Sequence, residues 1–140
     1  MGCVNSVDDT NLCSDSDVCT IDRCSAGACV AEAGLADEIA SLQFSTGKDV
    51  LAWSLAPLGA GRRYQVIRGV LSGLPVGSPS SGDVCVTQTT ANAIAVALAP
   101  SQGTGFWFLV RVRYTACGGS YGFEGEHGAR GAPRVSAACP

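Results

Sequence analysis

The side chains best suited to chemistry are the carboxylates and amides near the start of the chain. Calcium ions prefer several oxygen ligands of this kind. The candidate calcium ligands are Asp9, Asn11, Asp15, Asp17 and Asp22. The spacing is not that of an EF-hand, because each Asp-x-Asn or Asp-x-Asp pair runs into a cysteine where the next ligand belongs. Calcium binding is one hypothesis for this segment, and capping of tight turns by the same side chains is the other.

Cysteines form the second group of reactive residues. The chain of 140 residues contains eight, namely Cys3, Cys13, Cys19, Cys24, Cys29, Cys85, Cys117 and Cys139. This density is typical of disulfide-bonded proteins from oxidising compartments, so we expect an extracellular or cell-surface location. Five cysteines precede residue 30 and three follow residue 80. Either one disulfide therefore joins the two parts, or each part leaves one thiol free or bonded to another chain.

A nucleophile motif is present, but its context does not suit catalysis. Gly118, Ser120 and Gly122 match G-x-S-x-G, and His127 follows them. The motif acts at a strand-to-helix turn of a large α/β fold, whereas here it falls in a glycine-rich segment between predicted strands. The neighbouring glutamates are too close in sequence to complete a catalytic relay. We predict that the chain is not an enzyme.

Charge divides the chain into an acidic head, residues 1–34, and a mildly basic body, residues 35–140. The head has six acidic residues and one basic residue, a net charge of −5, whereas the body has eight basic and six acidic residues, a net charge of +2. No basic stripe is present, so we expect no nucleic-acid partner. No apolar run reaches membrane-spanning length, so we expect no membrane insertion. The asymmetry favours cation binding by the head, or contact between the head of one chain and the body of another.

The head contains a short repeat and has too few apolar residues for a core. Residues 9–14, DTNLCS, are followed directly by residues 15–20, DSDVCT. We predict a small loop-rich module stapled by disulfides. Residues 15–29 resemble the D-G-N-x-C-T-x-D-x-C-x-x-G-x-C repeats of large secreted bacterial and slime-mould surface proteins, with Ser16 in place of the usual Gly. The resemblance implies a modular extracellular protein and no defined activity.

The body alternates apolar and polar residues with a period of two, interrupted by Gly and Pro. This pattern indicates β-strands. The predicted strands are Glu38–Phe44, Val50–Leu55, Arg63–Arg68, Val84–Gln88, Ala93–Ala99, Gly105–Tyr114 and Arg134–Ala138. Seven short strands in a body of this length predict an all-β, immunoglobulin-like sandwich.

Strand parity predicts which side chains form the core, because successive residues point to opposite faces. The predicted inward residues are Leu51, Trp53, Leu55, Tyr64, Val66, Ile94, Val96, Leu98, Phe106, Phe108, Val110 and Val112. Each such side chain contributes roughly 1.5–3 kcal/mol when it is fully buried. A dozen of them suit the core of a small sandwich.

The body also resembles a fibronectin type III domain. The residues that carry this resemblance are Trp53, Tyr64, Val66, Leu98, Pro100, Val110 and Val112. Phe108 stands in place of the family's corner tyrosine, so the hydroxyl bond that usually fastens that corner cannot form. Residues 106–111, 117–122 and 139–140 further resemble a secreted bacterial subgroup. The resemblance implies that Cys117 lies nearest the head, and we therefore expect a disulfide between the head and Cys117.

Two outward-facing rows are candidate contact surfaces. Ala93, Ala95 and Ala97 form an uncharged row on a predicted edge strand, where Lys, Pro or a bulge is usual. Trp107 and Leu109 point away from the predicted core. Either row serves as a docking surface for another subunit, or it lies under a loop.

The leading functional hypothesis is a non-catalytic extracellular structural or assembly module, such as a subunit of a surface polymer or stalk. Its partners are then other protein subunits, including copies of itself. The alternative is a ligand- or carbohydrate-binding accessory domain of a larger secreted protein, which the small number of exposed aromatic residues disfavours. Calcium is the one cofactor that we expect.

Overall fold

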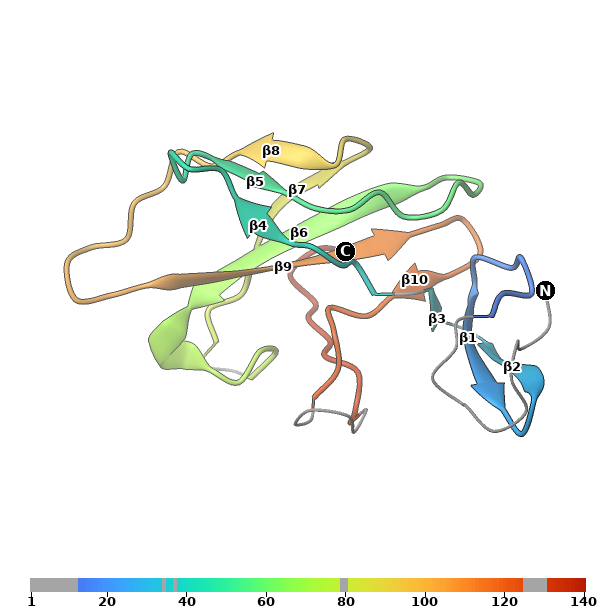
Figure 1. Ribbon diagram of the computed structural model, residues 1–140. Helices are drawn as coiled ribbons and strands as arrows, with labels where there is room; N and C mark the ends of the chain where they lie inside the picture. The colour runs from blue at the N-terminus through green and yellow to red at the C-terminus, as the bar shows by residue number, and fades with distance from the viewer. Residues whose placement is uncertain (1–12, 34, 37, 79–80, 125–130) are drawn as a thin grey trace.

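The structure, a computed structural model, describes residues 13–33, 35–36, 38–78, 81–124 and 131–140, and strands account for most of its regular structure (Figure 1). The strands are β1 Thr20–Ser25, β2 Ala28–Ala33, β3 Leu35–Ala36, β4 Gln43–Phe44, β5 Val50–Ala52, β6 Arg63–Val70, β7 Val84–Thr89, β8 Ala93–Ala95, β9 Phe106–Arg113 and β10 Gly118–Gly119. One 3-10 turn, η1 Leu71–Gly73, follows β6 among these residues. The predicted all-β class is confirmed.

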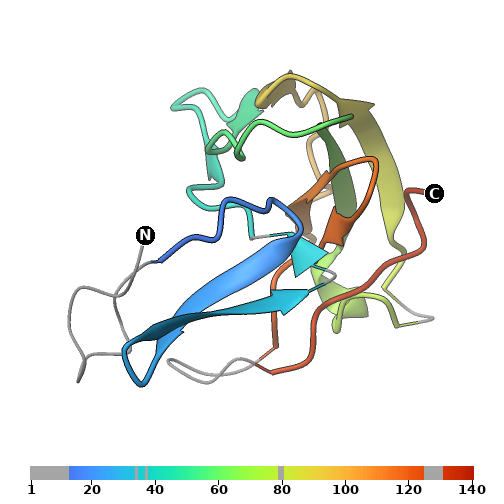
Figure 2. The ribbon, with the colours of Figure 1, turned by 90° about the vertical axis from the view of Figure 1, so that its right-hand side faces the viewer.

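Within the described residues the strands form three sheets. β1 and β2 pair as a hairpin, β3-β10-β9-β6-β7 form a five-stranded sheet, and β4-β5-β8 form a three-stranded sheet. The two larger sheets pack face to face, and the hairpin lies at one end of them, beside β3 and β10 (Figures 1 and 2). β3 follows the hairpin and pairs in parallel with β10, which places the start of the body in the five-stranded sheet.

The head is more regular than its sequence predicted. β1 and β2 pair antiparallel from Thr20 opposite Ala33 to Ser25 opposite Ala28. Ala26 and Gly27 connect them, and both have positive φ, 49° and 81°. Two central residues with positive φ make a turn whose twist matches that of the strands it joins. The prediction of a loop-rich head was wrong over residues 20–33, because a two-residue turn allows the flanking alternating residues to pair.

The core between the two larger sheets contains most of the side chains that strand parity assigned to it. Leu51, Trp53, Tyr64, Val66 and Val112 are all buried. The Trp53 and Tyr64 rings meet edge to face with centroids 5.5 Å apart. Such pairs contribute roughly 0.5–1.5 kcal/mol beyond the area that they bury.

Two predicted core residues are exposed. Leu55 and Leu98 have exposed fractions of 63% and 53%. β5 ends at Ala52 and β8 ends at Ala95, so both leucines lie beyond their strands. The alternation still holds for Trp53 and Val96, which directly follow these strands and are buried, but it fails three residues beyond each strand, where the backbone is no longer extended in a sheet.

The last predicted strand, Arg134–Ala138, is absent. The described residues at this end of the chain, 131–140, contain one isolated bridge, Phe123 to Pro133. The segment crosses the outer face of the five-stranded sheet, where Tyr121 and Cys139 are buried with Ile67. Its backbone bonds elsewhere, as in the 2.9 Å bond from Gln65 Nε2 to Pro140 O. β6 is consequently buried on both faces, by the main core on one side and by this segment on the other.

Candidate functional site

Three aspartates of the head cap a tight turn that leads into β1. Asp15 Oδ1 accepts a 2.7 Å bond from the Asp17 N–H, and Asp17 Oδ1 accepts a 2.9 Å bond from the Cys19 N–H. Asp22 Oδ2 accepts a 2.9 Å bond from the Asp15 N–H. The Thr20 hydroxyl adds a 2.9 Å bond to Asp15 Oδ1. These side chains replace backbone bonds that the turn cannot make, which is the capping role considered from the sequence.

The calcium hypothesis remains a prediction. Asp9 and Asn11 lie outside the described residues. Within the described ranges, no group of three or more His, Cys, Asp or Glu side chains is arranged to hold a metal ion. Asp15, Asp17 and Asp22 are close together, but their oxygens accept bonds from the turn itself.

A disulfide joins the head to the sandwich. Cys19 at the end of the turn bonds to Cys117, with an S–S distance of 2.04 Å and a sequence separation of 98 residues. This is the disulfide to Cys117 that the sequence led us to expect. It resolves the unequal division of the cysteines, because one residue of each part is used to connect them.

The other described cysteines are also bonded. Cys13 pairs with Cys29 inside the head, and Cys85 pairs with Cys139 across the outer face of the sandwich. Cys24 is disulfide-bonded as well. Cys3 lies outside the described residues. No described cysteine is free.

Close packing accompanies the disulfide at the junction. Val18 packs against the main core from the head side. Gly59 faces Val18 and Tyr114 so closely that a Cβ atom placed there would lie 2.7 Å from the Tyr114 ring and 2.9 Å from Val18 Cγ2. The Tyr114 hydroxyl donates a 2.8 Å bond to Pro57 O. Glycine at position 59 therefore allows the head to approach the sandwich.

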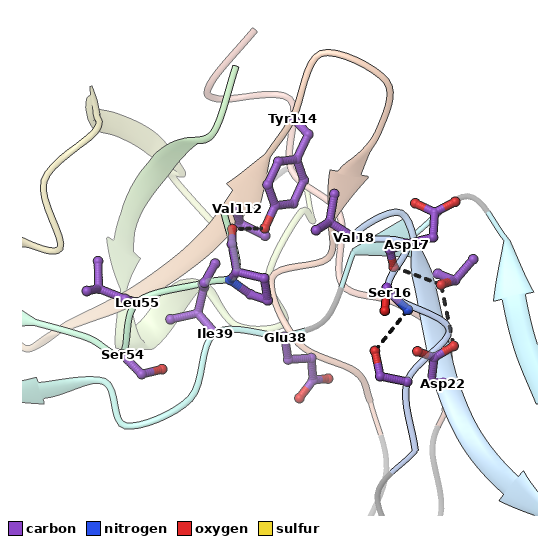
Figure 3. A pocket seen from close by; sticks show the side chains of 14 residues that line it. Ser16, Asp17, Val18, Asp22, Glu38, Ile39, Ser54, Leu55, Val112 and Tyr114 are labelled. Atoms are coloured by element: carbon purple, nitrogen blue, oxygen red, sulfur yellow. Dashed lines mark hydrogen bonds between the residues drawn. The ribbon is translucent and has the colours of Figure 1, made fainter. Parts of the chain in front are cut away.

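A hollow of about 260 Å³ lies at this junction (Figure 3). Its head side carries the polar residues Asp17 and Asp22, and its sandwich side carries Ile39, Leu55 and Tyr114. The hollow is smaller than the roughly 300–1,000 Å³ of ordinary small-molecule sites. It lies between residues of the head and residues of the sandwich.

The predicted alanine row lies at a sheet edge. β8 pairs with β5 on one side and is the last strand of its sheet within the described residues. Ala95 and Ala97 are exposed, and Ala93 is half-buried. Ala97 follows the end of β8, so the paired part of the edge is shorter than the sequence predicted.

Trp107 and Leu109 face away from the main core, but they are not open to a partner. Both are half-buried and pack against the cluster of Ile67, Tyr121 and Cys139. The Trp107 indole N–H donates a 3.1 Å bond to Val70 O. These two side chains therefore lie under a neighbouring segment, which was the alternative to a docking surface, because the C-terminal residues cover that face.

Ser120 of the G-x-S-x-G motif is buried, with an exposed fraction of 4%. Its Oγ accepts a 3.2 Å bond from the Gly122 N–H. His127 lies outside the described residues. The serine hydroxyl thus serves a local turn and is shielded from solvent.

A feature that sequence reasoning missed is a pair of arginines on neighbouring strands. Arg63 of β6 and Arg113 of β9 lie directly opposite each other. They line a hollow of about 290 Å³ together with Gln88 and Thr115. The alternation in both strands was visible, but the register that brings these two side chains together follows only from the pairing.

Comparisons with protein-family models, with curated proteins and with solved structures found no match to this chain. The described residues contain no apolar helix of membrane-spanning length.

Proposed function

We propose that this chain is a non-catalytic structural module of an extracellular assembly, in which the acidic head and the β-sandwich act as one unit. The observation that carries the proposal is the Cys19–Cys117 disulfide, which fixes the head to the end of the sandwich. A cross-link between two units limits their relative motion, which suits a part that must present its surfaces at a constant angle. Disulfides at this density fit an oxidising, extracellular location.

The sandwich is proposed to be of the fibronectin type III kind. The strand orders support it, since β4-β5-β8 and β10-β9-β6-β7 match the two sheets of a seven-stranded immunoglobulin-like sandwich. The buried Trp53, which directly follows β5, agrees with the same type. The head is proposed to be one of the Asp/Cys-rich repeats that precede such domains in secreted surface proteins.

Two surface features support an assembly role. The β8 edge carries no charged residue to discourage pairing with another chain. The acidic head and the basic body provide charges of opposite sign on one molecule, which favours contact between copies. Such contacts, repeated from one copy to the next, build a polymer or stalk.

Self-association of the purified, oxidised protein tests this proposal. Sedimentation equilibrium over a hundredfold range of concentration should show a rising average mass, and electron micrographs of the concentrated sample should show chains or clusters. Protein that has been reduced and alkylated is the control, because it lacks the Cys19–Cys117 disulfide. A strict monomer at every concentration would contradict the assembly role.

A ligand-binding accessory domain is the second candidate, and the junction hollow is the observation that favours it. Its mixed lining of carboxylates, hydroxyls and apolar side chains suits one polar group of a sugar or peptide better than a large ligand. Binding of the full chain on a glycan array, lost in a Ser54→Trp variant that fills the hollow, would support this function over the first.

A further inference from the structure

Arg63 and Arg113 form an unfavourable pair within the protein itself. They lie directly opposite each other on β6 and β9, and both side chains project from the outer face of the sheet. Like charges in directly opposite positions destabilise an antiparallel pair. No described residue forms an ion pair or a side-chain hydrogen bond with either guanidinium. Within the described residues, no Asp or Glu side chain lines the hollow beside the pair to supply a counter-charge.

The neighbouring arginine shows what a satisfied guanidinium looks like on this sheet. Arg111 Nε donates a 2.7 Å bond to Gln65 Oε1, and its Nη2 donates a 3.4 Å bond to Cys139 O. Its guanidinium carbon also lies 4.6 Å from the centre of the Tyr121 ring. Arg111 is thus held by bonds within the protein, whereas the guanidinium N–H donors of Arg63 and Arg113 make no such bond within the described residues.

The space beside the pair has the properties of an oxyanion site. The hollow of about 290 Å³ is lined by polar groups and by no Asp or Glu side chain, and its lining is Gly61, Arg63, Gln88, Arg113, Tyr114, Thr115 and Pro140. Each guanidinium presents five N–H donors in a planar fork that matches the two oxygens of a carboxylate. Two such forks on adjacent strands can hold one carboxylate between them.

We propose that Arg63 and Arg113 bind carboxylates from the acidic head of a second copy of this chain. The inference rests on the proposed assembly function and names the contact through which it acts. Charge complementarity supports the choice of partner, since residues 1–34 have a net charge of −5. Asp15 and Asp17 are exposed, and within the described residues their side chains accept bonds only from backbone N–H groups and a hydroxyl. Their negative charge is therefore open to an arginine of another molecule.

Sedimentation velocity of the full oxidised chain at several protein and salt concentrations tests the contact. The wild type should associate at low salt and dissociate at high salt, because the screening length falls from about 10 Å at 0.1 M to about 3 Å at 1 M. Arg63→Gln/Arg113→Gln should raise the dissociation constant at least about tenfold, since removing one partner of such a charge pair is costly. Lys48→Gln, a single exposed cation far along the sequence from the pair, should leave it unchanged.

The acidic side is tested with Asp15→Asn/Asp17→Asn. Asparagine keeps the Oδ1 acceptor that caps the turn and removes only the charge, so the head should fold and association should weaken about as much as in the arginine variant. Thermal unfolding of each variant checks that the fold is intact.

Three results overturn the proposal, and they are distinguishable. Association of the wild type that none of the charge variants weakens would refute this contact and leave the assembly function standing. A wild type that is monomeric throughout would refute both. Binding of an acidic oligosaccharide such as oligogalacturonate to the arginine pair, in a protein that does not self-associate, would assign the site to a glycan instead of a second copy.

Discussion

Removing the Cys19–Cys117 disulfide should destabilise the protein more than removing either of the other two described disulfides. The change is Cys19→Ala/Cys117→Ala, which leaves no free thiol to react. This disulfide closes a sequence separation of 98 residues, compared with 54 for Cys85–Cys139 and 16 for Cys13–Cys29. A longer closed loop removes more conformational entropy from the unfolded chain.

The magnitudes follow from these separations. The chain-entropy relation gives about 4.7 kcal/mol for the longest loop, about 4.2 kcal/mol for the intermediate one and about 3.1 kcal/mol for the shortest. Engineered changes usually deliver less than this relation predicts, so the expected losses are roughly 2–5 kcal/mol, in that order. The two double-alanine variants at the other disulfides are the matched controls.

Urea unfolding followed by far-ultraviolet circular dichroism and by tryptophan fluorescence measures the losses. Trp53 is buried in the main core, so its fluorescence reports on the sandwich. Equal losses for the longest and shortest loops, or a larger loss for Cys13–Cys29, would refute the argument from loop closure. A separate early transition in the Cys19→Ala/Cys117→Ala variant would show that the head had become an independent unit.

The remaining predictions concern single side chains. Gly59→Ala should cost about 1–3 kcal/mol in thermal unfolding, because the added methyl group has no space at the junction; an unchanged melting temperature would contradict the close packing. Tyr64→Phe should cost about 1–3 kcal/mol of stability, because the Tyr64 hydroxyl accepts a 2.9 Å backbone bond. Tyr121→Phe should be nearly neutral, because the buried Tyr121 hydroxyl has no hydrogen-bond partner within the described residues. Equal losses would refute this contrast. Burial raises the pKa of Tyr121 above 10.0, so the contribution of Tyr121 to stability is complete below pH 10.0 and is lost as the pH rises through the folded pKa. Tyr121→Phe should remove this loss of stability at high pH. A loss that persists in the variant would refute the assignment to Tyr121. The Ser45 hydroxyl donates a 2.7 Å bond to Asp49 Oδ1 and lowers the pKa of Asp49 below 3.8. The contribution of this carboxylate to stability is therefore present above pH 3.8 and lost as the pH falls through the folded pKa. Ser45→Ala should move the pKa of Asp49, measured by NMR titration, back toward 3.8, and an unchanged pKa would contradict this cause.

The sequence was sufficient to predict the fold class and most of the core, because period-two alternation is local. Residues within long strands, such as Val66 of β6 and Val110 of β9, were placed correctly. The errors lie where a strand stops. Leu55 and Leu98 continue the alternating pattern, although β5 and β8 end before them. No residue in the sequence marks the point at which either strand ends.

Contacts between segments far apart in the chain were harder to predict. The covering of Trp107 and Leu109 depends on where residues 131–140 run, and that segment reads as a strand although it forms none. The opposition of Arg63 and Arg113 depends on the register of β6 and β9. By contrast, the disulfide to Cys117 was expected from the odd number of cysteines in each part together with the topology that the fibronectin resemblance implied.

The disulfide between Cys19 and Cys117 also determines how the module responds to pulling. Tension that reaches Cys19 from its N-terminal side passes through the sulfur–sulfur bond to Cys117 and leaves along the C-terminal residues. The Cys19–Cys117 bond bypasses residues 20–116, which include β1 to β9, so tension between these two sulfurs does not extend that part of the backbone directly. Cys139 is bonded to Cys85 of β7, so a pull that reaches Cys139 also loads β7 through this second disulfide. A series of such modules would therefore lengthen little under tension.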